Sequence, residues 1–143
     1  MDFRTLAVLH AVPTLFLTGL IWFVQVAHYP LFAKIGPEYF VAYERAYTPR
    51  VGYVVMPTML AEVALAVLVW WRAPAELQAW TLAGLVALAV VWLSTFLLQV
   101  PCHNVLSERA DPAVMERLVA GNWLRTAAWT CRGGIATLLL LRC

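Results

Sequence analysis

Four long apolar segments constrain the fold of this chain more than any other feature. They are Leu6–Tyr29, Val51–Trp71, Ala79–Val100 and, approximately, Asn122–Leu141. A hydrocarbon core about 30 Å thick takes about 20 helical residues, and only helices or closed barrels satisfy their backbone polar groups within it. The segments are continuously apolar rather than alternating, which favours helices over barrel strands. We therefore expect an all-α fold: an integral membrane four-helix bundle in a single domain, residues 1–143.

Composition supports a lipid environment. Of the 143 residues, 63% are hydrophobic and 13% are charged, whereas soluble domains hold about 45–50% apolar and about 25% charged residues. The lipid bilayer is thus the expected partner, in a bacterial inner membrane or a plasma membrane. A net charge of +2 is too small to indicate nucleic-acid binding. The first segment exceeds the apolar region of a secretory signal, so we expect it to stay in the fold.

Two long connections, residues 30–50 and 101–121, lie on one side of the expected bundle. The segment Pro37–Tyr47 begins with a proline, which is favoured in the first helical turn. Asp111 is a typical N-cap for a helix over residues 113–120. These signals predict two short interfacial helices on this face.

The same side collects most of the polar residues near the ends of the apolar segments. They are Gln25, His28, Tyr29, Glu44, Tyr47, Arg50, Gln99, His103, Asn104, Asn122 and Arg125. In lipid, such side chains turn towards the bundle interior or a water-filled cavity. We therefore predict a polar funnel opening on this face.

The halves of the chain also resemble each other faintly. Gln25-Val26-Ala27-His28-Tyr29-Pro30 ends the first segment, and Gln99-Val100-Pro101-Cys102-His103-Asn104 ends the third. Aligning Gln25 with Gln99 indicates a parallel repeat of two hairpins.

Glu62 and Arg132 lie deep within their segments. Each is about 15 Å from the segment start, at 1.5 Å per helical residue. An unpaired charge at that depth costs about 2.5–3.5 kcal/mol. We predict a structural ion pair between them; the alternative is a functional floor to a pocket.

His28, His103 and Glu44 are the candidate catalytic residues. Imidazole and carboxylate groups suit general acid–base chemistry. The same three side chains would suit a transition metal such as iron, copper or zinc. A third interpretation is that both histidines are interfacial and bonded to backbone or carboxylate groups. The cofactor is therefore open, either none or a transition metal. His10, alone near the other interface, is expected to have no role.

Polar residues at the same end of the expected bundle are the candidates for substrate binding. Asn122 and Arg125 would hold an oxyanion through charge-assisted hydrogen bonds. The full set of expected substrate-binding residues is Asn122, Arg125, Gln25, Gln99 and Tyr43.

Two short motifs resemble a known family. They are Pro101-Cys102-His103-Asn104-Val105-Leu106 and Asn122-Trp123-Leu124-Arg125-Thr126. With four apolar segments in 143 residues, the chain resembles the anthrone-oxygenase-like family of small membrane proteins. The resemblance rests mainly on the last third of the chain. It implies oxygenation of a lipophilic polycyclic phenol without an obvious bound cofactor.

The expected function is that of a membrane-embedded oxidoreductase or oxygenase acting on a lipophilic aromatic or quinone-like molecule. Whether the chain is an enzyme stays open. The alternatives are a non-catalytic carrier of a small amphipathic molecule and an accessory subunit; a homo-oligomer is also open. The long connections carry Lys34, Arg45, Arg50, Arg109 and Arg117, against Arg4, Arg72 and Arg142 opposite. This excess predicts that the polar face is cytoplasmic.

Overall fold

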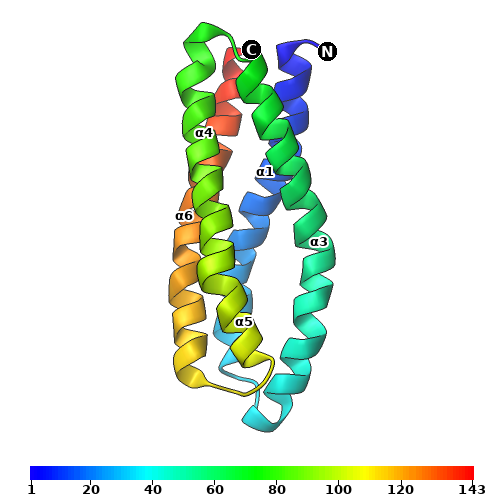
Figure 1. Ribbon diagram of the computed structural model, residues 1–143, viewed down its shortest axis with the longest axis vertical. Coiled ribbons are helices and arrows are strands. Elements are labelled where there is room, and N and C mark those ends of the chain that lie inside the picture. Colours follow the sequence, from blue (N-terminus) through cyan, green and yellow to red (C-terminus); the bar gives the residue numbers. More distant parts are fainter.

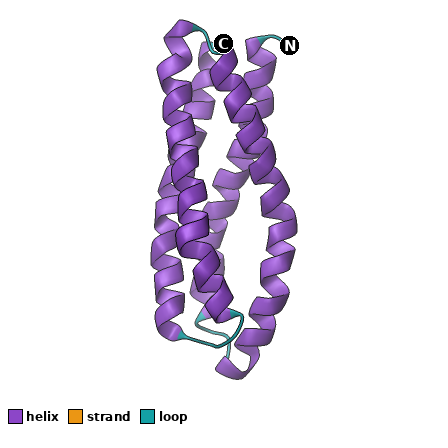
Figure 2. Cartoon of the chain, viewed as in Figure 1, coloured by secondary structure: helices purple, strands orange, loops and turns teal.

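The chain folds into a bundle of four antiparallel helical rods. The computed structural model describes all residues, 1–143, and contains no strand (Figure 2). The elements are α1 (Phe3–Phe23), η1 (Val24–His28), α2 (Tyr29–Phe32), α3 (Pro37–Arg72), α4 (Ala75–Ser94), η2 (Thr95–Gln99), α5 (Val100–Leu106) and α6 (Pro112–Arg142). η1 and η2 are single π-helical turns that join α1 to α2 and α4 to α5.

Both termini lie at one end of the bundle, with the turn between α3 and α4 (Figure 1). The other end holds the α2–α3 and α5–α6 connections and is called the loop end below. α1 packs against α3 and α6, and α4 packs against the same two helices. Three buried clusters form the core: Leu6, Val69, Leu77 and Leu139; Leu17, Ile21, Met59, Val91, Ala128 and Trp129; and Tyr29, Phe32, Phe40, Cys102, Leu106 and Leu118.

A proline follows each π-turn after one intervening residue. The Tyr29 N–H donates to the carbonyl of Val24, and the Val100 N–H donates to that of Thr95. The next residue is Pro30 or Pro101, which has no N–H and clashes with the carbonyl four residues earlier. Widening the turn by one residue accommodates the ring. The two halves of the chain thus share the same backbone structure at this point, a π-turn followed by a proline-containing helix.

The π-turns correct the register of the expected repeat. They match Pro30 with Pro101, and therefore His28 with Gln99. The alignment of Gln25 with Gln99 is three residues away from this match. The shared amide side chains suggested a different register from the one that the backbone has, in which Pro30 and Pro101 follow the two π-turns at the same position.

The two connections are helical, but not as separate interfacial helices. Pro37 lies in the first turn of α3, and the Asp111 side chain accepts a hydrogen bond from the Val114 N–H, so both expected starts are confirmed. That hydrogen bond lowers the pKa of the Asp111 carboxyl group. Each helix then continues to the far end of the bundle. The prediction of two short helices is therefore wrong.

Gly121 directly follows the expected helix over residues 113–120, where a glycine often ends a helix, but α6 continues through it. No residue of the chain has a positive φ, so Gly121 does not end a helix in the left-handed conformation. A Cβ there would lie 3.3 Å from Gln99 Nε2. The glycine instead permits close packing between α6 and η2.

Three of the rods are long and apolar enough to cross a membrane: Phe3–Phe32, Pro37–Arg72 and Ala75–Leu106. α6 was the fourth expected span. It is 31 residues long but more polar. Its polar residues Asn122, Arg125 and Arg132 are buried against the other helices. The length of α6 suits a fourth crossing of the membrane, and its polar side chains within the bundle face the other helices.

Candidate functional site

A buried histidine–carboxylate pair lies near the loop end. His103 on α5 donates from Nδ1 to Glu44 Oε1 on α3 at 2.5 Å, and Thr48 Oγ1 donates to the same oxygen at 2.8 Å. Glu44 is completely buried, at 0% exposure. The other ring nitrogen, Nε2, is 3.4 Å from the Tyr29 hydroxyl. Because an ionised carboxylate only accepts hydrogen bonds, Glu44 fixes the tautomer that leaves Nε2 free as a base.

A cavity of about 250 Å³ adjoins this pair. Its wall is largely aliphatic, with contributions from α1, α3 and η2. The polar or aromatic residues on it are Tyr29, Tyr47, Thr48, Thr95, Gln99, His103, Arg125 and Trp129. The volume is slightly below the usual range for ligand pockets, about 300–1,000 Å³. The cavity therefore suits a small lipophilic molecule with a polar group.

A hydrogen-bonded chain orients Arg125. Asn122 Nδ2 donates to Gln25 Oε1 at 2.8 Å, and Arg125 Nη1 donates to Asn122 Oδ1 at 3.2 Å. The Arg125 guanidinium lies 5.1 Å from the centre of the Trp129 ring, within cation–π range. Arg125 lines the cavity, whereas Gln25 and Asn122 do not. Of these three expected substrate-binding residues, Arg125 reaches the cavity, and Asn122 and Gln25 hold the Arg125 side chain in place.

Two side chains on the cavity wall have unmet hydrogen-bonding capacity. Gln99 is 2% exposed, and both its amide nitrogen and its oxygen lack a partner. Arg125 Nε is also buried without a partner, and no carboxylate forms an ion pair with this arginine. Buried polar groups are paired in the great majority of cases. A ligand oxygen could accept hydrogen bonds from Arg125 Nε and from the Gln99 amide nitrogen, whereas the Gln99 amide oxygen would need a donor such as a hydroxyl group.

His28 and Tyr43 lie outside the cavity wall. The His28 ring stacks on Tyr47, with centroids 4.4 Å apart and planes at 21°, and contacts Phe32 edge-on. Tyr43 continues the stack against Tyr47, with centroids 5.9 Å apart. Tyr47 alone of the three lines the cavity. The expected site members His28 and Tyr43 therefore support the wall from behind.

The alternative metal site does not form as a three-residue set. No group of three or more His, Cys, Asp or Glu side chains is arranged to hold a metal ion. Glu44 contacts His103 directly. His28 packs instead in the aromatic stack, because its neighbours on α3 at this level are tyrosines.

The predicted polar funnel at the loop end is closed. Phe32, Phe40, Leu106 and Leu118 are buried there in one apolar cluster. They come from α2, α3, α5 and α6, so all four rods contribute. Sequence position placed the polar residues at the correct end, but it could not show that aromatic and aliphatic side chains cover them.

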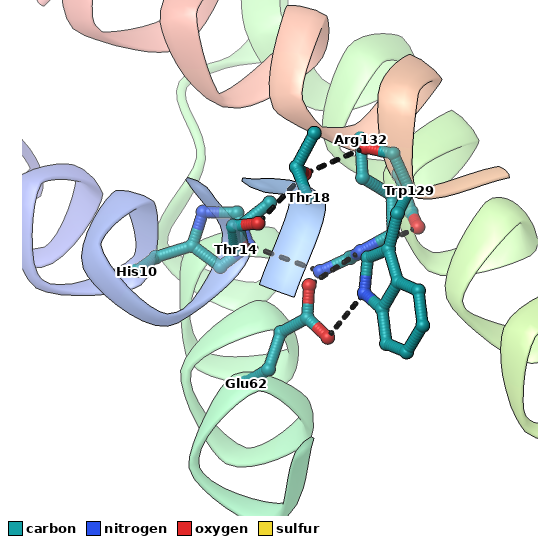
Figure 3. A network of polar contacts seen from close by, with 7 residues as sticks. His10, Thr14, Thr18, Glu62, Trp129 and Arg132 are labelled. Atoms are coloured by element: carbon teal, nitrogen blue, oxygen red, sulfur yellow. Dashed lines mark hydrogen bonds and ion pairs between the residues drawn. The ribbon is translucent and has the colours of Figure 1, made fainter. Parts of the chain in front are cut away.

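A second polar centre lies towards the termini (Figure 3). Arg132 Nε donates to Glu62 Oε1 at 2.8 Å, as the depth argument predicts. Trp129 Nε1 donates to Glu62 Oε2 at 3.1 Å, and Arg132 also donates to the Gly84 carbonyl. Both carboxylate oxygens are thus paired. Trp129 links the centre to the cavity, because its ring lines the cavity wall.

His10 belongs to this centre, contrary to the expectation that it has no role. It is buried, and its Nε2 lies 3.3 Å from Arg132 Nη2 and from Thr14 Oγ1. Thr18 donates to the carbonyls of Thr14 and Trp129 (Figure 3). The spacing of His10, Thr14 and Thr18 at four residues is the sequence signal for this face.

Comparisons with known proteins show no relative. No protein-family model, no curated protein and no solved structure matches the chain. The cavity and the polar residues on its wall are therefore the basis for assigning a function.

Proposed function

We propose that this chain is a membrane-embedded oxidoreductase or oxygenase that binds a lipophilic phenol or quinone-like molecule in the cavity. The observation that supports this most strongly is the pairing of buried Glu44 with His103 beside an apolar cavity. A binding cavity alone would not need a desolvated carboxylate. A general base needs a partner that orients its ring and stabilises its protonated form.

A bilayer position follows from the charges on α3. Arg50 and Arg72 are 22 residues apart, which is about 33 Å along a helix at 1.5 Å per residue. This matches a hydrocarbon core of about 30 Å. Between them α3 carries one charge, Glu62, which is paired with Arg132. We place the two arginines at opposite membrane surfaces of a bacterial inner or plasma membrane.

The proposed first step is proton abstraction. The phenol O–H bond breaks, its electron pair stays on oxygen, and the proton forms an N–H bond at His103 Nε2, directly or through the Tyr29 hydroxyl. Glu44 stabilises the resulting imidazolium through Nδ1. Arg125 and Gln99 donate hydrogen bonds to the phenolate oxygen from the cavity wall. Such donors, fixed before reaction, are effective where water is excluded.

Oxygenation would follow with dioxygen as co-substrate. In an anthrone-like phenol the anion's charge spreads onto a ring carbon. Overall, the ring CH₂ of the keto form, which is a CH in the phenol tautomer, becomes a carbonyl: one oxygen atom of O₂ enters the carbonyl group, and the other leaves as water with the two hydrogens. This step rests on the resemblance to the anthrone-oxygenase-like family. A non-catalytic carrier would need the cavity but not the Glu44–His103 pair, so this pair favours the enzyme.

The test is binding of 2-naphthol by the detergent-purified protein, compared with 2-methoxynaphthalene. The ether has the same ring system but no acidic hydroxyl. Wild type should prefer naphthol, and Arg125→Gln should lower naphthol affinity about tenfold, since hydrogen bonds to charged groups contribute about 1.5–3 kcal/mol. Tyr43→Phe, behind the wall, is the matched control and should bind normally. Equal affinity for both compounds would contradict the proposal.

A further inference from the structure

The most exposed residues of the cavity wall lie on α3 and on α5. Among its lining residues, Met56 on α3 and Val100 on α5 are each 40% exposed. Gly52 and Thr95 beside them are half-buried, and a Cβ at Gly52 would meet no atom within 4 Å. These residues border a gap between α3 and the η2–α5 segment, called the side opening below.

Both ends of the cavity are closed. Towards the termini, Met59, Val91 and Trp129 are at most 1% exposed and form a packed cluster. Towards the loop end, the stack of His28 on Tyr47 and the buried apolar cluster around Phe32 cover it. A ligand that moved along the bundle axis would have to break one of these packed layers.

The surroundings of the side opening are apolar. Tyr53 is 80% exposed, Phe96 54% and Leu97 68%. Met56 lies 16 residues from Arg72, or about 24 Å along α3, which is inside a hydrocarbon core of about 30 Å that starts at Arg72. Acyl chains, not water, would cover this part of the surface.

We infer that the ligand enters the cavity sideways from the acyl-chain region of the bilayer, through the side opening between Gly52 and Met56 on α3 and Thr95 and Val100 opposite. The inference rests on the proposed function for the identity of the ligand. It adds that the substrate is a molecule dissolved in the membrane. Its ring system passes the apolar edge, and its oxygen then meets Gln99 and Arg125 on the inner wall.

A competing route exists at a second groove. This groove, of about 610 Å³, lies between α2 and α6 and includes Ala120 and Trp123. Tyr29 lines both the groove and the cavity, so its ring separates them. Tyr29 is 3% exposed and packs against Phe32. Passage by this route would require displacement of a core side chain, which the side opening does not.

The first test measures transfer of 2-naphthol from lipid vesicles to the protein in lipid nanodiscs, read by energy transfer from tryptophan in stopped flow. Gly52→Phe should lower the association rate about tenfold and should lower the dissociation rate as well. Slowing of both rates identifies a barrier on the path, whereas a lost binding contact would raise the dissociation rate. Gly134→Phe is the matched control, since a Cβ there also meets no atom within 4 Å. Ala120→Phe tests the competing groove. The Gly134→Phe and Ala120→Phe variants should each leave both rates unchanged.

The second test does not depend on naphthol. Met56→Cys, combined with Cys131→Ser and Cys143→Ser to remove the exposed thiols, should react in vesicles with a lipid-soluble maleimide and not with a charged one, because Met56 is exposed and lies inside the hydrocarbon core. Equal reaction with the charged reagent would overturn the inference, as would slowing by Ala120→Phe instead of Gly52→Phe. If wild type binds no naphthol, the proposed function fails, while the labelling result still decides whether the side opening faces lipid.

Discussion

At the scale of single residues, partners far apart in sequence determine what each polar side chain does. The Glu62–Arg132 pair could be predicted, because two charges at equal depth in lipid have few alternatives. His10 could not be assigned in the same way, because its partner Arg132 lies 122 residues away on another helix. Tyr29 was missed as a site residue for the same reason: only the fold brings its hydroxyl to His103.

The buried ion pair supports a prediction about stability. Glu62→Gln or Arg132→Gln should each lower the free energy of unfolding by about 3–5 kcal/mol, because each leaves one buried charge uncompensated. The double variant should lose less than the sum of the two. Thermal unfolding in detergent measures this, with Glu76→Gln at an exposed position as the control. Additive losses would show that the two charges do not stabilise each other.

At the scale of elements, local signals predicted where helices begin better than where they end. Pro37 and Asp111 mark the starts of α3 and α6. Both ends were misplaced: α3 continues past Tyr47, and α6 continues past Gly121, which packs against Gln99 instead of ending the helix. The π-turns could not be predicted from the spacing of apolar residues, because that spacing does not detect a single turn with one extra residue. Prolines after a helical segment were the available signal.

The π-turn before Pro101 should be necessary for the site. Pro101→Ala restores an N–H that can bond to the carbonyl four residues earlier, and so favours an ordinary α-helical turn. Loss of the extra residue would rotate α5 relative to α4 by up to about 100° and move His103 away from Glu44. We expect weaker naphthol binding with unchanged helix content by circular dichroism. Pro49→Ala, within α3 and without a π-turn, should bind normally. Unchanged affinity in Pro101→Ala would show that the turn is not required.

At the scale of the whole molecule, composition correctly indicated a helical bundle with membrane-spanning length, and the asymmetry of polar residues indicated the end that holds the cavity. The closed loop end and the side opening could not be predicted in this way, because both follow from the separation of α3 from η2 and α5. No local pattern encodes that separation, because it results from packing among all four rods.

The arrangement of charges predicts the orientation of the bundle. Both termini lie at one end (Figure 1), so both should be on the same side of the membrane and the two loops on the other. The positive-inside rule places the loop end in the cytoplasm. Reporter fusions at the C-terminus should therefore show an external location, while a tag inserted at residues 107–111 should be cytoplasmic. The reverse pattern would contradict this orientation.

In the proposed function, the Glu44–His103 pair removes a proton from a phenol held in the cavity. The most direct measurement is the absorption spectrum of bound 2-naphthol as a function of pH. Wild type should lower the pKa of bound naphthol relative to naphthol in detergent alone, because Arg125 and the protonated His103 stabilise the anion. His103→Gln should abolish most of this effect, and His28→Gln, outside the cavity wall, should retain it. An unshifted pKa of naphthol bound to wild type, or an equal loss in both variants, would contradict the account.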